Sequence, residues 1–589
     1  MSGVSVAERA RLSWLLVRRA LRSASGRLHA NPFLRWRYLS PKTDRLLIAP
    51  QELRTTDPTR ASEIYAGRFA FAGKIVICDR RSPFEMSAPS DEWAAQLLGF
   101  GWLRHLRAAD TGIARANGRA LVDEWITIQG SWHETGWRPD ILAERIIAWL
   151  SQSPLVLQDA DVQFYRRFLR SLSRQVRYLR NAAGDARDGV VQIRIGIALC
   201  FACLCMAGQA RHLNAAVRKL TGELERQILP DGGHVGRNPG VAAELLLDLL
   251  PLRQAFTSRN IAPPPLFLHA IERMMPMLRF YRHADGNFTL FNGMGPTNAA
   301  EVATVQAYDD ARGEPVLNAA HSGYQRMQMD DLLAIVDTGT PPPLGLSQEA
   351  HAGTLAFELS SGAQRIVVNC GMTAINRDSW RQLARATAAH STVTFNDASS
   401  SRFREIRAFR KLIGVPIVSG PKHVTVERED HADAVMLRAS HDGYADRFGI
   451  IHNRMLTLLE NGRRLEGEDT FTPRRGTSIP AGEEDQFAIR FHLHPSIKAN
   501  RLADGHSVML MLPSRDVWSF DAHEDHVELE ESVFLAGNDG PRRTLQIVIL
   551  GRASHVPRVD WTISHTNRTT PPQPSSRRDR GDEPELPLE

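Results

Sequence analysis

The stretch Thr354-Leu-Ala-Phe-Glu-Leu-Ser360 is followed by Ser361-Gly362 and then by Arg365-Ile-Val-Val-Asn369. Its apolar residues recur with a period of two, which is typical of a β-strand because successive side chains point to opposite faces. The Ser-Gly pair lies where a turn would connect two such strands. We therefore predict a β-hairpin at residues 354–369.

A second hairpin is predicted further along the chain. Asn461-Gly462 separates two runs of strand-like sequence, 454–460 and 463–467, and Asn-Gly is the dipeptide best suited to a type I′ turn. We expect further strands in four segments: 487–493, 507–512, 517–520 and 544–550. The part of the chain after Asp285-Gly286 is thus predicted to be β-structure.

The preceding part of the chain has a helical period. Apolar residues recur every three to four positions in seven segments: 92–107, 140–150, 161–179, 191–206, 215–227, 241–252 and 265–279. A run of helices followed by a run of strands indicates separate α and β domains rather than alternating βαβ units. The length of the chain also indicates more than one domain, because 589 residues exceed the roughly 250–300 residues that a single hydrophobic core supports.

The composition favours an acidic partner. The formal net charge is +6, and a positive field attracts anions such as nucleic acid or acidic polysaccharide. Nucleic acid is disfavoured, because the Lys and Arg residues are dispersed and no Walker A loop, zinc-finger spacing or aromatic RNA-binding signature is present. A basic surface that serves only solubility is the alternative.

The cysteines and the N-terminal segment indicate the cellular compartment of the protein. Five cysteines form no disulfide framework, and Cys200 and Cys203, a Cys-x-x-Cys without a second pair, are predicted to be buried thiols. The apolar stretch 12–17 is shorter than a secretory core, and no run reaches the 18 or more apolar residues of a transmembrane helix. We predict a soluble cytoplasmic protein, with an amphipathic N-terminal helix on a membrane or on another domain as the alternative.

Three motifs carry a family resemblance. His351-Ala-Gly-Thr-Leu-Ala-Phe-Glu-Leu-Ser-Ser-Gly362, Arg365-Ile-Val-Val-Asn-Cys-Gly371 and Arg385-Ala-Thr-Ala-Ala-His-Ser-Thr-Val393 resemble the C-terminal domain of the heparinase II/III family of polysaccharide lyases. Upstream, Leu229-Pro-Asp-Gly-Gly-His-Val-Gly-Arg-Asn-Pro239 and the helix behind it resemble a loop of that family's helical domain. The resemblance covers most of residues 90–560.

This resemblance implies an α+β multidomain fold, an incomplete (α/α) toroid followed by an antiparallel β-sandwich. The expected divisions are an N-terminal helical or irregular segment (1–89), the toroid (90–285), a connector along the domain interface (286–320), the sandwich (321–562) and a disordered tail (563–589). The tail is rich in Pro, Ser and charged residues, with little to bury.

Such lyases act by β-elimination, in which a base removes the proton α to a uronate carboxylate and an acid protonates the leaving oxygen. The family is expected to supply a Tyr in the toroid loop, an Asn or His on a toroid helix, and a His on a sandwich strand. Here the Tyr matches Val241 or Gly240, the Asn-His pair falls near Asp188-Gly189, and the first strand His matches Glu349.

Nearby residues are the candidate replacements. We predict that His234, Arg237 and Tyr281 form the catalytic set with Glu349, with Arg237 pairing the uronate carboxylate and Tyr281 or His234 taking the proton. The alternative is structural: His234 fixes its loop, Arg237 makes a cap or an ion pair, and Tyr281 packs at the domain boundary.

The resemblance also implies a structural zinc on the residues that match His351, Asn369 and His390. Two imidazoles are good zinc ligands, whereas the neutral amide of Asn369 is poorer than the carboxylate that the family has. A metal-free, hydrogen-bonded cluster is the alternative, so no cofactor is certain.

Trp132, His133, Trp137 and Arg138 are the candidate substrate-binding residues, because aromatic faces stack on sugar rings and Arg pairs with carboxylate or sulfate. Packing of the two Trp residues in a helical core is the alternative.

Together these features favour an enzyme, a carbon–oxygen lyase that acts on an acidic, uronate-containing polysaccharide. The alternative is a non-catalytic glycan-binding or cell-envelope protein with a degenerate lyase site, for which the periplasm or cell envelope replaces the cytoplasm. The sequence leaves the sugar and the oligomeric state open.

Overall fold

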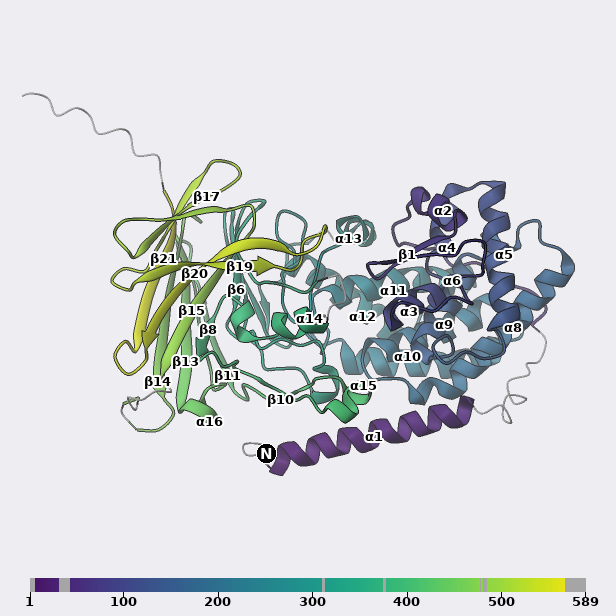
Figure 1. The fold of residues 1–589 in the computed structure, drawn as a ribbon, viewed down its shortest axis with the longest axis horizontal. Coiled ribbons are helices and arrows are strands. Elements are labelled where there is room, and N and C mark those ends of the chain that lie inside the picture. Colours follow the sequence, from purple (N-terminus) through teal and green to yellow (C-terminus); the bar gives the residue numbers. More distant parts are fainter. Residues whose placement is uncertain are drawn as a thin grey trace, which may run out of the picture.

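The computed structural model describes residues 6–30, 43–309, 313–373, 378–476, 478–479 and 485–566. Its N-terminal half is helical and its C-terminal half consists of antiparallel sheets (Figure 1). The predicted fold class, a helical toroid followed by a β-sandwich, is therefore confirmed. The tail predicted for 563–589 lies outside the described residues from 567 onward, and its first three residues instead belong to the last strand, β21 (Arg558–His565).

The helical half alternates between two rows of helices along the chain. One row comprises α3 (Asp91–Gly99), α6 (Pro139–Ser151), α9 (Val190–Cys205) and α11 (Gly240–Ser258), which pack side by side. The other comprises α5 (Gly112–Ile128), α8 (Val162–Ala182), α10 (Leu213–Gln227) and α12 (Pro265–Phe280). The short helices α4 (Leu103–Ala109) and α7 (Ser153–Leu157) adjoin α5.

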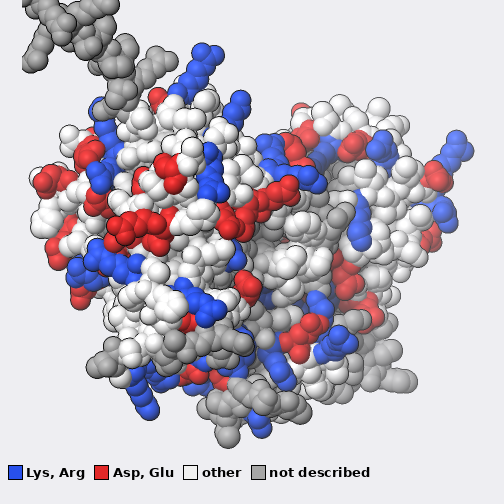
Figure 2. Space-filling view, turned by 60° about the vertical axis from the view of Figure 1, so that its left-hand side comes forward, with Lys and Arg blue, Asp and Glu red and all other residues white. Residues whose placement is uncertain are grey.

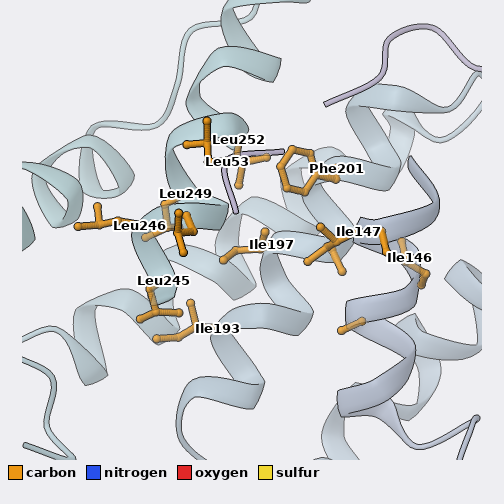
Figure 3. Close-up of a cluster of buried hydrophobic side chains, with 14 of the residues drawn as sticks. Leu53, Ile146, Ile147, Ile193, Ile197, Phe201, Leu245, Leu246, Leu249 and Leu252 are labelled. Atoms are coloured by element: carbon orange, nitrogen blue, oxygen red, sulfur yellow. The ribbon is translucent and has the colours of Figure 1, made fainter. Parts of the chain in front are cut away.

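The centre of this half lies around α9, which is apolar on nearly all sides and therefore needs neighbours on all sides. In Figure 3, Ile193, Ile197 and Phe201 of α9 lie between Ile147 of α6 and Leu249 of α11. The cysteines of α9 are free and buried, as the sequence predicted.

Local signals set several helix starts. Ser90, Thr111 and Asp161 each accept a hydrogen bond from a backbone N–H of the first turn of the helix that follows. Pro139 occupies the first position of α6, where its missing N–H costs nothing.

The C-terminal half contains two large antiparallel sheets. The eight-stranded sheet has the order β11 (Val424–Asp430), β12 (Val435–His441), β13 (Ile450–Leu459), β14 (Arg464–Pro473), β21, β18 (Val517–Asp521), β17 (Ser507–Met511) and β16 (Lys498–Arg501). The nine-stranded sheet has the order β19 (Val527–Phe534), β20 (Arg542–Arg552), β15 (Gln486–Leu493), β7 (Gln364–Val368), β6 (Phe357–Ser361), β5 (Leu332–Asp337), β4 (Tyr324–Met329) and β3 (Asn318–Ala319), with β8 (Val393–Phe395) beside β15.

Both predicted hairpins are present, as β6–β7 and β13–β14. Asn461 and Gly462 have φ of 52° and 74°, the left-handed values that a type I′ turn requires. The core between the sheets is aromatic: Trp561 stacks on Phe357 and contacts Phe491 edge-on. A Cβ at Gly467 would lie 2.0 Å from the Trp561 ring, so only glycine fits there.

The remaining elements lie around these two halves. They are α1 (Val6–Ala30), α2 (Pro58–Tyr65), β1 (Arg68–Phe71), β2 (Lys74–Ile77), α13 (Ala299–Gln306), α14 (Asp378–Ala384), β9 (Arg402–Phe403), α15 (Arg410–Ile413), β10 (Ile417–Ser419) and α16 (Ala445–Phe448). No helix in the described part of the chain is both long and apolar enough to cross a membrane. On the face in Figure 2, basic and acidic residues intermingle.

Candidate functional site

A cavity of about 630 Å³ lies between the helical half and the sandwich. Asp188 and Gly189 at the start of α9 line it, as do Val235 of the toroid loop and residues 343–346 of the sandwich half. Asp188 and Gly189 are the positions near which the family resemblance places the Asn-His pair, and Val235 belongs to the loop in which it places the Tyr. The cavity is therefore the candidate functional site, and its fourth side is formed by α1.

The helix α1 is bonded to both halves across this cavity. Arg18 and Arg22 form ion pairs with Asp188 at 3.1 and 3.0 Å. On the sandwich side, Arg19 donates to the carbonyls of Leu412 and Gly345 at 2.9 and 3.2 Å. Figure 1 shows α1 on the outside of the molecule, with α15 beside it.

Apolar contacts complete this attachment. Leu12 and Leu15 of α1 are buried against Ile413 of α15, so the face of α1 that carries them is covered by the sandwich half. Polar and apolar contacts thus act together to hold α1 across the domain junction.

The positions that correspond to the family's Tyr and His are not among the residues that line the cavity. Gly240 begins α11, and a Cβ there would lie 2.8 Å from the Met294 sulfur. Glu349 exposes 60% of its side chain and pairs with Arg381 at 2.7 Å. Any replacement would have to come from the other candidate residues.

His234 is buried in the toroid loop, and both ring nitrogens are bonded. Its Nε2 donates to Gln227 Oε1 at 3.1 Å, and its Nδ1 accepts from the Gly236 N–H at 3.0 Å. Burial lowers the pKa of His234 to about 4, so the ring is neutral at neutral pH. These contacts shape the loop.

Arg237 joins the helical half to the sandwich. It donates to the carbonyls of Ser322, Thr340 and Gly323 at 2.8, 3.0 and 2.9 Å, and it forms a buried ion pair with Asp337. Its guanidinium also lies 4.7 Å from the centre of the Tyr324 ring. All of these partners belong to the sandwich half.

Tyr281 lies next to this network. It is buried, and its ring meets Tyr324 edge-on at 5.5 Å. Burial raises the pKa of its phenol well above the ordinary value. The structure therefore brings Tyr281 and Arg237 together around Tyr324, whereas the contacts described for His234 and Glu349 lie in two other networks.

His351 and His390 form a direct pair. His390 donates from Nδ1 to the Ala386 carbonyl at 2.8 Å, so its Nε2 accepts from His351 Nδ1–H at 2.9 Å. Asn369 is engaged elsewhere: its Oδ1 accepts from the Ser391 N–H and its Nδ2 donates to Glu358. Among the described residues no three His, Cys, Asp or Glu side chains are placed to hold a metal. The residues present fit a hydrogen-bonded cluster better than the zinc centre that the family implies.

The candidate substrate-binding residues lie around the start of α6. Trp137 is buried, stacks on Trp132 at 6.0 Å and donates from Nε1 to the Gln129 carbonyl. His133 accepts from the Gly136 N–H at 3.1 Å, and Arg138 pairs with Asp140. The two Trp rings pack against the helical core, and a role in sugar binding stays a prediction.

Two groups of charged residues were not predicted from sequence. The first group consists of two carboxylates whose partners are 100 or more residues away in the sequence. Asp337 pairs with Arg237, and Asp188 pairs with Arg18 of α1. A second cluster surrounds Arg194, the single charged residue in the otherwise apolar α9. An isolated charge in a buried helix needs a partner, and this is the signal from which the cluster was predictable.

The fold and this junction define a class of protein, the polysaccharide-lyase architecture of a helical toroid joined to a β-sandwich. The crystal structure of heparinase III has a TM-score of 0.68 to this chain at 12% identity, over 91% of this chain and 89% of that one. Heparan sulfate lyase HepC from Pedobacter heparinus has a TM-score of 0.58 at 14% identity, over 92% and 88%.

Sequence comparison assigns the family. Residues 311–562 match the model of the heparinase II/III-like C-terminal domain. The FtsZ-localized protein C of Caulobacter vibrioides (strain NA1000 / CB15N) is 32% identical over 488 residues, which cover 81% of this chain and 83% of that protein. The chain belongs to the heparinase II/III-like family.

Proposed function

We propose that this chain uses the lyase architecture to bind and localise rather than to cleave polysaccharide by β-elimination. The observation that carries this proposal is the position of α1. Arg18 and Arg22 neutralise Asp188 at the junction cavity, and Arg19 ties the same helix to the sandwich. A polysaccharide chain that entered from this side would have to displace α1.

The state of the candidate acid and base residues supports the same proposal. A catalytic base must come within about 3 Å of the proton that it removes. His234 and Arg237 are buried, and their nitrogens are bonded to protein partners. A substrate would have to replace these bonds before either residue could act.

The named relative suggests where such a protein works. Because that protein is called FtsZ-localized, we propose that this chain also accumulates on FtsZ assemblies. The test is to sediment purified protein with assembled and with disassembled FtsZ of the same organism. The protein should pellet only with the assembled form, and a protein that stays in the supernatant in both cases would contradict the proposal.

β-Elimination on an acidic polysaccharide is the second candidate function. The observation that favours it is the shared network of Arg237 and Tyr281 at the domain junction. In that function Arg237 would pair the uronate carboxylate, Tyr281 or His234 would take the proton, and Glu349 would border the substrate. Incubation with acidic polysaccharides, followed by the ultraviolet absorbance of an unsaturated product, separates the two candidates.

A further inference from the structure

A second hollow, of about 380 Å³, lies at the centre of the helical half. The helices α3, α6, α9 and α11 all line it, and none of its lining residues borders the junction cavity. Arg194 lies five residues after Gly189, the residue that precedes α9, so the hollow lies about 8 Å further along that helix at 1.5 Å per residue. It is a separate site.

The floor of this hollow is a network of ion pairs. Arg194 pairs with Glu144 at 2.9 Å and also with Glu244, and its Nε lies 3.9 Å from Asp248. Arg54 pairs with the same Asp248 at 2.8 Å. The charges therefore largely neutralise one another within the protein.

The two glutamates remain open to solvent although they lie inside the hollow. Glu144 and Glu244 expose 43% and 48% of their side chains, whereas Arg194 exposes only 12%. The guanidinium thus lies beneath the carboxylates and fixes their orientation. The free carboxylate lone pairs are hydrogen-bond acceptors available to a ligand.

The walls combine these acceptors with apolar surface. Phe71, Trp102 and Ile147 line the hollow together with the charged groups. Most of the other lining residues are charged or polar, so the wall offers many hydrogen-bonding groups with a smaller apolar part. The volume lies near the lower end of the roughly 300–1,000 Å³ of ligand sites. The size suits one or two rings rather than a polysaccharide segment.

We propose that this hollow binds a neutral sugar unit. Sugar hydroxyls donate to the two open carboxylates, and these charge-assisted bonds are stronger than neutral ones. A uronate is disfavoured, because five carboxylates line the hollow against four guanidinium groups, and the exposed carboxylates would repel another anion. The proposal does not rest on FtsZ binding, and the hollow shares no lining residue with the junction cavity.

Saturation-transfer NMR and titration calorimetry on the full-length protein test this proposal. The probes are methyl glucoside, methyl galactoside and N-acetylglucosamine, with glucuronic and galacturonic acid as the anionic counterparts. At least one neutral sugar should bind, with a Kd at least tenfold lower than that of either uronate. The Glu144→Gln/Glu244→Gln variant should weaken that binding at least tenfold, because charge-assisted bonds become neutral.

Two further variants make the test specific. Glu427→Gln removes a carboxylate from an exposed pair with Arg438 on the sandwich and should leave binding unchanged. Gln96→Trp narrows the hollow from its exposed rim, leaves the ion pairs in place and should likewise weaken binding at least tenfold. The proposal is overturned if no neutral sugar binds, if a uronate binds more tightly, or if Gln96→Trp and the double variant both bind like the unaltered protein.

Discussion

Replacement of Arg237 by alanine tests whether this residue joins the two halves. The change removes donors from three buried carbonyls and leaves Asp337, of which only 3% of the side chain is exposed, without its cation. Breaking one side of a buried ion pair costs about 3–5 kcal/mol. We therefore expect Arg237→Ala to lose about 4 kcal/mol of stability.

The loss should be visible by differential scanning calorimetry. About 4 kcal/mol corresponds to a fall in Tm of roughly 8 °C for a domain of the sandwich's size. Hydrogen exchange should also increase around Ser322 and Gly323, whose carbonyls lose their donor. Arg237→Lys should lose less, because it keeps the charge but not the planar fork.

The pH dependence gives a further signature. Burial raises the pKa of Asp337 although Arg237 opposes it, so removing Arg237 raises that pKa further. A carboxyl group whose pKa is raised in the folded state lowers the free energy of unfolding at pH values above its unfolded pKa of about 3.9, and this loss becomes smaller as the pH falls. The free energy of unfolding of Arg237→Ala should therefore differ least from that of the unaltered protein at acidic pH.

A matched control is Arg438→Ala, since Arg438 exposes 55% of its side chain in its pair with Glu427, and exposed pairs contribute about 0–1 kcal/mol. If Arg237→Ala melts within about 1 °C of the unaltered protein and hydrogen exchange at the junction is unchanged, the structural role is refuted.

Three other predictions concern the loop that carries His234, the helix α1, and the cluster of His351, Asn369 and His390. His234 is buried with its pKa lowered to about 4, so the free energy of unfolding should fall by about 3 kcal/mol as the pH drops from 6.5 to 4. Denaturant titrations should show a smaller fall over this pH range for His234→Gln. The same pH dependence in both proteins would contradict this prediction. Arg18→Ala/Arg22→Ala removes both pairs to Asp188 and should speed amide exchange along α1, whereas unchanged exchange would mean that these pairs do not hold the helix. Elemental analysis should find zinc well below one equivalent and more of it in Asn369→Asp, because carboxylate is the better ligand; stoichiometric zinc in the unaltered protein would refute the hydrogen-bonded cluster.

The fold was predictable where local pattern decides it. The change of period near residue 286 separated the two halves, and Asn461-Gly462 marked its hairpin. The helix α5 escaped prediction because it begins at Gly112 and Gly118 interrupts its apolar pattern. The strand β11 escaped because it lies at a sheet edge, where both of its faces are largely exposed.

The candidate site stays a prediction, but its residues show what a sequence can and cannot give. The sequence placed His234 and Arg237 in one loop, and in the structure both lie between α10 and α11. Which way each side chain points depends on partners such as Asp337, which lies 100 residues away at the end of β5. The attachment of α1 through Asp188 spans 170 residues, and no local pattern encodes such a contact.

The ultraviolet absorbance of unsaturated uronate products tests the central claim most directly. Purified full-length protein and its Arg18→Ala/Arg22→Ala variant would be incubated with a panel of acidic polysaccharides, with a heparinase III as the positive control. The account predicts no rise in absorbance for either form, because the candidate residues His234 and Arg237 stay bonded to protein partners even when α1 is loosened. A rise that scales with the amount of protein and disappears in Tyr281→Phe or His234→Ala would contradict it and establish β-elimination.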